Sequence, residues 1–271
     1  MGDAGLFGPR SLTWQVNSEG VLLFGGGTAL ILQVAHPLVA AGVSQHSDYR
    51  EDPWGRLYRT LDVVTRITFG SKATAEGAAA SLREVHSRVN GESTEAGGRY
   101  PSGTHYDARM PKLAMWVHAT LVRTTLDVYQ RYVRPLTIDE QRRYYDEQKL
   151  AAEMFGVPAQ RQPATYAEFN EYYADTLASE LAVTDALRDV VDATLNPPLP
   201  FFTRPLVEAM NLATVGMLPP ALREELGLPW TGRRQRLLDA SRSVVRHALP
   251  LVPSMLREFP PARTARRRAA A

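Results

Sequence analysis

The stretch PKLAMWVHATLVRTTLDVYQRY, residues 111–132, decides the fold class of this chain. Pro111 suits the first turn of a helix, because the amide hydrogen that proline lacks would have no partner there. Ala114 and Leu121 share one face of such a helix with His118, at spacings of four and three residues. The stretch therefore predicts a long helix that turns an imidazole toward the core.

Helical periodicity also dominates the rest of the 271 residues, and no strand-like alternation predicts a hairpin. Thr137 with Glu140, and Thr165 with Glu168, have the spacing of capping boxes that open two further helices. We expect helices over residues 21–43, 52–69, 73–90, 111–132, 137–156, 165 onward, 180–195, 204–217, 220–226 and 232–247, and a loop over residues 92–111. The predicted fold class is all-α, in one domain without internal repeats.

Prolines and glycines punctuate the first half of the chain. Pro37 predicts a break in the helix over residues 21–43, because proline removes a donor and clashes with the preceding turn. Asp52 as N-cap and Pro53 as the first helical residue open the next helix, and Gly70 ends it.

The composition excludes several classes of site. The chain has no cysteine, which rules out disulfides, thiolate metal ligands and cysteine-ligated iron–sulfur clusters. Its net charge of +2 provides no strong field toward nucleic acid. Residues 1–10 lack the pattern of a secretory signal, and the longest apolar run, residues 21–32, is interrupted by glycines and too short to span a bilayer. We expect a cytoplasmic protein with no transmembrane segment and no nucleic-acid partner, and a homodimer is compatible with the sequence.

Three histidines lie among small or branched apolar residues: His36, His86 and His118. His86 shares a predicted helix face with Ala79, and Trp116 beside the third histidine adds flat aromatic surface suited to a planar guest. Any one such histidine is more often a hydrogen-bonded core residue than a ligand. Together, in an all-helical chain without thiols, they indicate a metal or haem pocket.

Arg56 and Thr60 lie one helical turn apart, on a predicted face that continues through Val63 and Ile67. An arginine turned toward a core needs an anion or a carbonyl group to compensate its charge. A haem propionate, an oxygen-derived anion or a carboxylate such as that of Asp62 would each serve.

Other catalytic signatures are absent from the sequence. There is no Glu-x-x-His pair of a di-iron bundle, no His-Glu-x-x-His zinc motif and no Gly-x-Ser-x-Gly elbow. The glycines at residues 25–27 lack the Gly-Lys-Ser/Thr of a phosphate-binding loop. The histidines therefore remain the most direct indication of chemistry.

Four segments together resemble a known family. They are ALILQVAHPLVAAGVSQHSDYREDPWGRLYRT (residues 29–60), REVHSRVNG (83–91), MWVHATLV (115–122) and NLATVGMLPPALREELGLPW (211–230). They are similar to the oxygenase family of the mycophenolic acid side-chain-cleaving enzyme and the rubber oxygenase (latex clearing protein) catalytic domain. The resemblance covers roughly residues 15–250.

This resemblance implies an all-α, globin-like domain with additional helices that binds haem b. In the family's rubber-cleaving members an iron-ligating histidine lies downstream of an Arg-x-x-x-Thr pair. The order carries over to Arg56 and Thr60 followed by His86, which we expect to ligate the iron. His118 is similar to a further histidine of the family pattern, and we expect it or His36 to move protons.

Two departures from the rubber-cleaving members stand out. Those members have a catalytic glutamate upstream of the arginine, whereas residues 39–43 here contain no acid. They also have a lysine able to ligate iron just before the threonine, where this chain has Arg59, whose guanidinium stays charged. These departures argue against cleavage of polyisoprene, and His36 would supply the polar group that the glutamate provides elsewhere.

The expected function is that of a haem b-dependent oxygenase that uses dioxygen on a hydrophobic small molecule. The expected catalytic residues are Arg56, Thr60, His118 and His36, and the expected cofactor-binding residues are His86, Arg56, Thr60 and Trp116. Two alternatives stay open: a non-enzymatic haem-binding or sensing protein, and a cofactor-free helical interaction protein. We expect an N-terminal extension over residues 1–14, the haem-binding domain over 15–260 and a basic disordered tail over 261–271.

Overall fold

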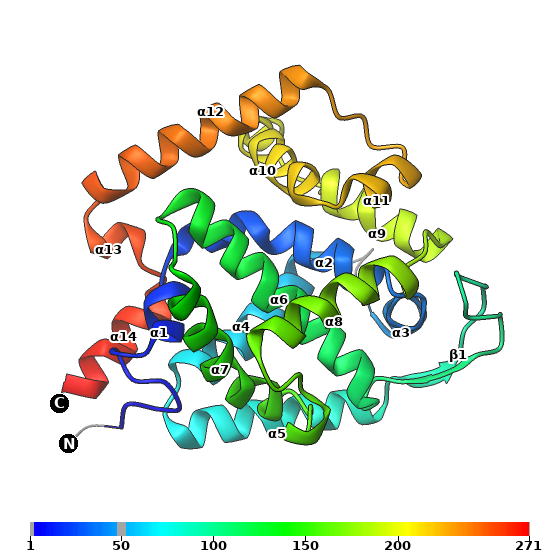
Figure 1. Cartoon of the computed structure of the whole chain (residues 1–271), viewed down its shortest axis with the longest axis horizontal. Helices are drawn as coiled ribbons and strands as arrows, with labels where there is room; N and C mark the ends of the chain where they lie inside the picture. Colours follow the sequence, from blue (N-terminus) through cyan, green and yellow to red (C-terminus); the bar gives the residue numbers. More distant parts are fainter. Residues whose placement is uncertain (1–2, 48–52, 271) are drawn as a thin grey trace.

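A computed structural model describes residues 3–47 and 53–270 of the chain, with the side chains of residues 3–47 and 58–270. Within these residues the chain forms fourteen α-helices, four 3-10 helices and one two-stranded sheet. The all-α fold class is thereby confirmed, while the globin-like arrangement of the helices stays a prediction. Figure 1 shows α6 in the middle of the molecule and α12 along one edge.

The α-helices are α1 (Leu12–Asn17), α2 (Gly26–Val34), α3 (Pro37–His46), α4 (Pro53–Phe69), α5 (Lys72–Ser87), α6 (Pro111–Tyr132), α7 (Ile138–Met154), α8 (Tyr166–Ser179), α9 (Asp185–Leu195), α10 (Arg204–Met217), α11 (Pro220–Glu225), α12 (Gly232–Ala248), α13 (Ser254–Arg257) and α14 (Pro260–Ala270). The 3-10 helices are η1 (Gly20–Gly25), η2 (Ala159–Arg161), η3 (Phe201–Thr203) and η4 (Leu249–Leu251). Strand β1 (Asn90–Glu92) pairs antiparallel with β2 (His105–Asp107), so that Gly91 lies opposite Tyr106.

Helix α6 is the central element, because it packs against η1, α2, α7, α8 and α12. One face carries Met115 and Val122 into a core that residues of α1, α7 and α8 complete. The other face carries Trp116 into a core formed with α2 and α9. The helix begins at Pro111 and ends at Tyr132, as the sequence predicts.

The predicted break at Pro37 separates α2 from α3. His36 is the N-cap of α3, and its Nδ1 accepts a hydrogen bond from the backbone amide of Leu38 at 3.3 Å. Proline then occupies the first helical position, where its missing amide costs nothing. The two helical segments, Gly20–Val34 and Pro37–His46, meet at an angle of 104°.

Helices α4 and α5 form a helical hairpin, joined by Gly70 and Ser71 and packed against each other. A Cβ on Gly70 would lie 2.2 Å from the carbonyl oxygen of Arg66, so this turn requires glycine. Ser71 caps α5, since its side chain accepts from the amide of Thr74. The predicted N-cap of α4, Asp52, lies outside the described residues.

The two predicted capping boxes differ in the structure. Thr137 accepts from the amide of Glu140, and the Glu140 carboxylate accepts from the amide of Thr137, so the first box is complete. Thr165 accepts from the amide of Glu168, but the Glu168 carboxylate accepts from the amide of Ala164 instead. The second helix start is therefore confirmed with half of its box.

The predicted loop over residues 92–111 is wrong in part, because the chain forms the β1–β2 hairpin there. Each strand has three residues, too few for alternation to be visible in the sequence. Tyr106 is buried in this hairpin and packs with Leu38 and Leu113.

The prediction of a disordered tail over residues 261–271 is wrong for the residues that the structure describes there. Residues 260–270 form α14, and Ala262 and Ala265 are buried against Trp14 and Phe69. Small alanine side chains allow this helix to approach two aromatic rings closely, and Arg268 donates to the carbonyl oxygen of Phe69. The predicted boundary at residue 14 also falls inside α1, whose Trp14 belongs to this cluster.

Within residues 3–47 and 53–270, no single helix is both long enough and apolar enough to cross a bilayer. The α2–α3 region passes by composition only as a bent pair, and Ile31 and Val34 of that pair are buried in the protein.

Candidate functional site

His118 of α6 is one of several buried polar groups that lack a hydrogen-bond partner among the described residues, and both of its ring nitrogens are affected. Its side chain is almost fully covered, at 2% exposure, and neither ring nitrogen has a hydrogen-bond partner among the described residues. Burial lowers its pKa to about 4, with the backbone of Gln148 acting in the opposite direction. The imidazole is therefore neutral near pH 7, and the backbone of Gln148 is close to it but not within hydrogen-bonding geometry, so both ring nitrogens keep bonding capacity for a ligand.

The surroundings of His118 are apolar. Its ring lies 5.9 Å from the ring of Phe155, which follows α7. Phe155 packs in turn on a buried cluster that includes Ile67 of α4, Ala78 of α5 and Ala151 of α7. The unsatisfied imidazole thus borders the place where α4, α5 and α7 meet, and we call the region of these three helices and His118 the candidate site.

His86 lies in the last turn of α5, half-buried. Burial lowers the pKa of His86 below its ordinary value, and the carboxylate of Asp107 on β2 acts in the opposite direction. A neutral imidazole is the form that binds a metal ion, so its environment suits a ligand.

The predicted Arg-x-x-x-Thr pair lies on the other helix of the hairpin. Arg56 is part of α4, and its side chain is outside the described residues. Thr60 is exposed on that helix and takes part in an interaction with another group. Arg56 stands 14 residues before Gly70 and His86 stands 16 residues after it. At 1.5 Å per residue both positions lie about 21–24 Å from the turn, at the same open end of the hairpin.

His36 belongs to a separate polar network on the α3 side of the molecule. Its Nε2 lies 3.8 Å from the Glu180 carboxylate and 3.5 Å from the Tyr100 hydroxyl, which donates to Glu180. Lys112 donates to the Tyr100 hydroxyl at 3.1 Å, and Arg99 pairs with Glu180 at 3.0 Å. Because Nδ1 of His36 accepts from a backbone amide, Nε2 carries the proton of the neutral ring.

Burial shifts the pKa values of His36 and Tyr100 in this network. Burial lowers the pKa of His36 to about 4, although Glu180 acts to raise it. Burial, together with the bond to Glu180, raises the pKa of Tyr100 above its ordinary value. The structure therefore places a carboxylate, Glu180, beside the histidine that the sequence analysis offered as a substitute for a missing acid. Glu180 follows α8 and carries no sequence signal that could have indicated this contact.

Trp116 does not share a pocket with His118. Its indole nitrogen donates to the carbonyl oxygen of Leu32 at 3.0 Å, and its ring stacks on Tyr173 at 5.5 Å. Two residues along a helix correspond to a rotation of about 200°, so the two side chains leave α6 on opposite sides. The described residues also bring no three His, Asp or Glu side chains together as a protein-only metal site, a condition that a haem does not need.

Comparison with known proteins gives the family. Residues 13–247 match the description "ER-bound oxygenase mpaB/B'/Rubber oxygenase, catalytic domain". The chain belongs to this oxygenase family. The resemblance drawn from the sequence is thereby confirmed over most of the chain.

Two proteins similar to this chain are uncharacterized proteins of Mycobacterium bovis and Mycobacterium tuberculosis. Each is 27% identical to this member of the oxygenase family over 232 residues, which is 83% of this chain and 87% of the relative. No solved structure matches the chain. Enzymatic activity of the oxygenase class follows from the family, whereas the cofactor and the substrate do not follow from these relatives.

Proposed function

We propose that this chain is a haem b-dependent oxygenase that acts with dioxygen on a hydrophobic small molecule. The observation that carries the proposal is the imidazole of His118, which is fully buried in an apolar region and has no partner for either nitrogen among the described residues. Such a group is costly, so its retention is best accounted for by a ligand that it contacts.

The residues present fit a haem. His86 is the proposed iron ligand, because burial keeps its imidazole in the neutral form that binds metal. The apolar cluster that includes Val63 and Phe155 lies nearer the turn of the hairpin than His86, and it would line the pocket on that side. When bound, the haem supplies the redox-active iron that activates dioxygen.

The chain's own residues would act around this group. Arg56 and Thr60, at the same end of the hairpin as His86, offer donors to a propionate or to a developing anion. His118, neutral and enclosed, would offer a ring nitrogen that can accept a proton from the reacting groups. His36 with Glu180 would form a proton path that is separate from the iron ligand. The apolar walls favour a hydrophobic substrate and exclude water.

The test is spectroscopic. Haem-loaded wild type should show a Soret band that His86→Ala abolishes or shifts strongly, whereas His105→Ala, which removes an exposed imidazole, should leave it unchanged. An unchanged spectrum in haem-replete His86→Ala protein would remove that residue from the iron. The Soret band of His118→Ala tests whether this second imidazole contacts the haem itself or only a molecule bound to the haem.

Oxygen uptake distinguishes the two alternatives. Consumption of dioxygen with lipophilic alkenes or small aromatic compounds supports the oxygenase. A haem-containing protein that consumes none across a broad panel would be a binding or sensing protein. A colourless, iron-free and folded protein after haem-supplemented expression would be a cofactor-free interaction protein.

A further inference from the structure

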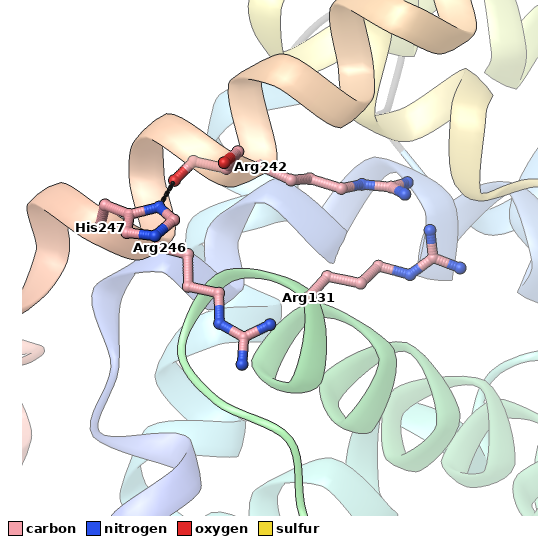
Figure 2. A pocket seen from close by; sticks show the side chains of 5 residues that line it. Arg131, Arg242, Arg246 and His247 are labelled. Atoms are coloured by element: carbon pink, nitrogen blue, oxygen red, sulfur yellow. Dashed lines mark hydrogen bonds between the residues drawn. The ribbon is translucent and has the colours of Figure 1, made fainter.

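A second place in the molecule is built to receive a charged ligand. A cavity of about 390 Å³ lies between the end of α6 and the C-terminal half of α12. It is lined by Arg131, Arg242, Ser243, Arg246 and His247, and we call it the arginine pocket. Figure 2 shows the side chains of Arg131 and Arg242 extending in the same direction, with Arg246 turned toward the end of α6. None of these residues belongs to the candidate site.

Arg242 is the buried member of the arginine pocket. Its side chain is 14% exposed, and its Nε and Nη2 atoms are covered without a hydrogen-bond partner among the described residues. Only Nη1 approaches a carboxylate, that of Asp239 at 3.4 Å, which is 56% exposed and also accepts from Gln235. Most of the bonding capacity of this guanidinium is therefore unused.

The other two arginines add charge without adding a partner. Within the described residues neither Arg131 nor Arg246 forms an ion pair. The acid one turn before Arg131 on α6, Asp127, is paired with Arg123 at 3.2 Å. Burial lowers the pKa of the Arg242 guanidinium below its ordinary value, and the like charge of Arg131 acts in the same direction. Three arginines thus line one cavity that has no carboxylate among its lining residues, with the guanidinium groups of Arg131 and Arg242 extending the same way and that of Arg246 apart from them (Figure 2).

The remaining polar groups at the pocket do not neutralise this charge. Nδ1 of His247 donates to the backbone carbonyl of Ser243 at 2.7 Å, so the Ser243 carbonyl is already bonded and does not compensate an arginine. Tyr132 lies near Arg242 and offers its hydroxyl to the guanidinium as a hydrogen-bond acceptor. Burying an uncompensated guanidinium is costly, and an anion in the pocket would offset that cost.

The neighbouring cavity indicates room for more than an inorganic ion. Arg131 also lines a second cavity of about 420 Å³, whose wall includes Tyr173, Leu177 and Leu218. Volumes of this size are those of small-molecule pockets. A ligand with a charged head in the first cavity could extend an organic part into the second.

We propose that the arginine pocket binds the phosphoryl group of a small anionic molecule. Guanidinium groups match phosphate oxygens through paired hydrogen bonds. A doubly or triply charged phosphoryl head compensates three arginines, whereas a single carboxylate would leave two of the charges unmatched. The shared chemistry is a phosphate monoester or diphosphate head, supplied either by a soluble molecule or by a lipid at a bilayer surface.

The experiment uses full-length protein and inorganic pyrophosphate as the probe, titrated by calorimetry at constant ionic strength. Arg131→Gln/Arg246→Gln removes two charges from the pocket, and Arg233→Gln/Arg236→Gln removes two exposed charges from the start of the same helix. A charge-assisted contact is worth about tenfold or more in affinity, so we expect the pocket variant to lose about a hundredfold and the control to stay within about twofold.

Arg242→Gln provides a second, independent variant. It should abolish binding and leave the unliganded protein as stable as wild type or more stable, since it removes the buried unpaired guanidinium. The melting temperature of wild type should rise with pyrophosphate, and that of Arg242→Gln should not. This readout separates loss of the site from loss of the fold.

A vesicle arm distinguishes the two sources of the phosphoryl group. Phosphatidylcholine vesicles that contain phosphatidic acid are sedimented with each variant. Binding to these vesicles alone, lost in the pocket variants and kept in the control, assigns the lipid head; binding of pyrophosphate with the same pattern assigns a soluble ligand. If neither probe binds, or if the pocket and control variants lose binding equally, the proposal is overturned.

Discussion

Replacing His118 by leucine should stabilise the haem-free protein, most strongly in acid. Leucine has a similar size and removes two buried nitrogens that have no partner among the described residues. Each unsatisfied buried group costs about 1–3 kcal/mol, so His118→Leu should raise the free energy of unfolding at pH 7 by about that amount. For a chain of 271 residues, 2 kcal/mol corresponds to a rise of about 3–4 °C in melting temperature.

The pH dependence gives the sharper test. Burial lowers the pKa of His118 from 6.5 to about 4, so the unfolded chain takes up a proton on this residue between those values and the folded protein does not. Stability is therefore lost as pH falls from 6.5 to 4, by about 3 kcal/mol at 1.36 kcal/mol per pH unit. The leucine variant lacks this loss, whereas the similar contribution of His36 is present in both proteins and cancels in the comparison.

Urea unfolding of haem-free protein at pH 7 and pH 4.5 measures both effects, provided that the slopes agree. Thr120→Val is the matched control on the same helix. Its hydroxyl donates to the carbonyl of Val117 at 2.7 Å, so its removal should cost about 1 kcal/mol at both pH values. If His118→Leu destabilises the protein like this control, or if its stability falls in parallel with wild type, then the imidazole has a partner and the reasoning fails.

Three further substitutions test the packing at the hairpin turn, on the far side of α6 and at α14. Gly70→Ala should lower the free energy of unfolding by about 1–3 kcal/mol in urea titrations, because the new Cβ would meet the carbonyl of Arg66 at the hairpin turn. Trp116→Phe should cost about 1–3 kcal/mol while leaving any Soret band unchanged, since it leaves the buried carbonyl of Leu32 without its donor on the far side of α6. Ala265→Asp should detach α14 from Trp14 and Phe69. Limited proteolysis should then cut the folded variant after residue 257 and leave folded wild type uncut at that position.

The local features of the fold were predictable from the sequence. The bounds of α6, the break at Pro37 and the cap at Thr137 depend on residues within one or two turns of each other. Helix α14 was missed because its arginine-rich composition is that of a solvated tail. What holds it is a contact with Trp14 and Phe69, far away in the sequence.

The candidate site shows the same limit. The inward direction of His118 followed from helical spacing, and its burial bears this out. The partners of His36 did not follow, because Tyr100 and Glu180 lie 64 and 144 residues away and meet it only in the folded chain. The spacing of a motif indicates the face of a helix on which a residue lies, whereas the opposing group depends on how distant helices pack.

The position of α14 has a consequence for biosynthesis. Ala262 and Ala265 cover Phe69 at the end of α4, and Arg268 donates to the carbonyl oxygen of that phenylalanine at 2.7 Å. Arg268 and Phe69 are 199 residues apart in the sequence, so the turn end of the hairpin stays uncovered until this distant segment has been synthesised. We therefore expect the contact between α14 and the hairpin to form late in folding.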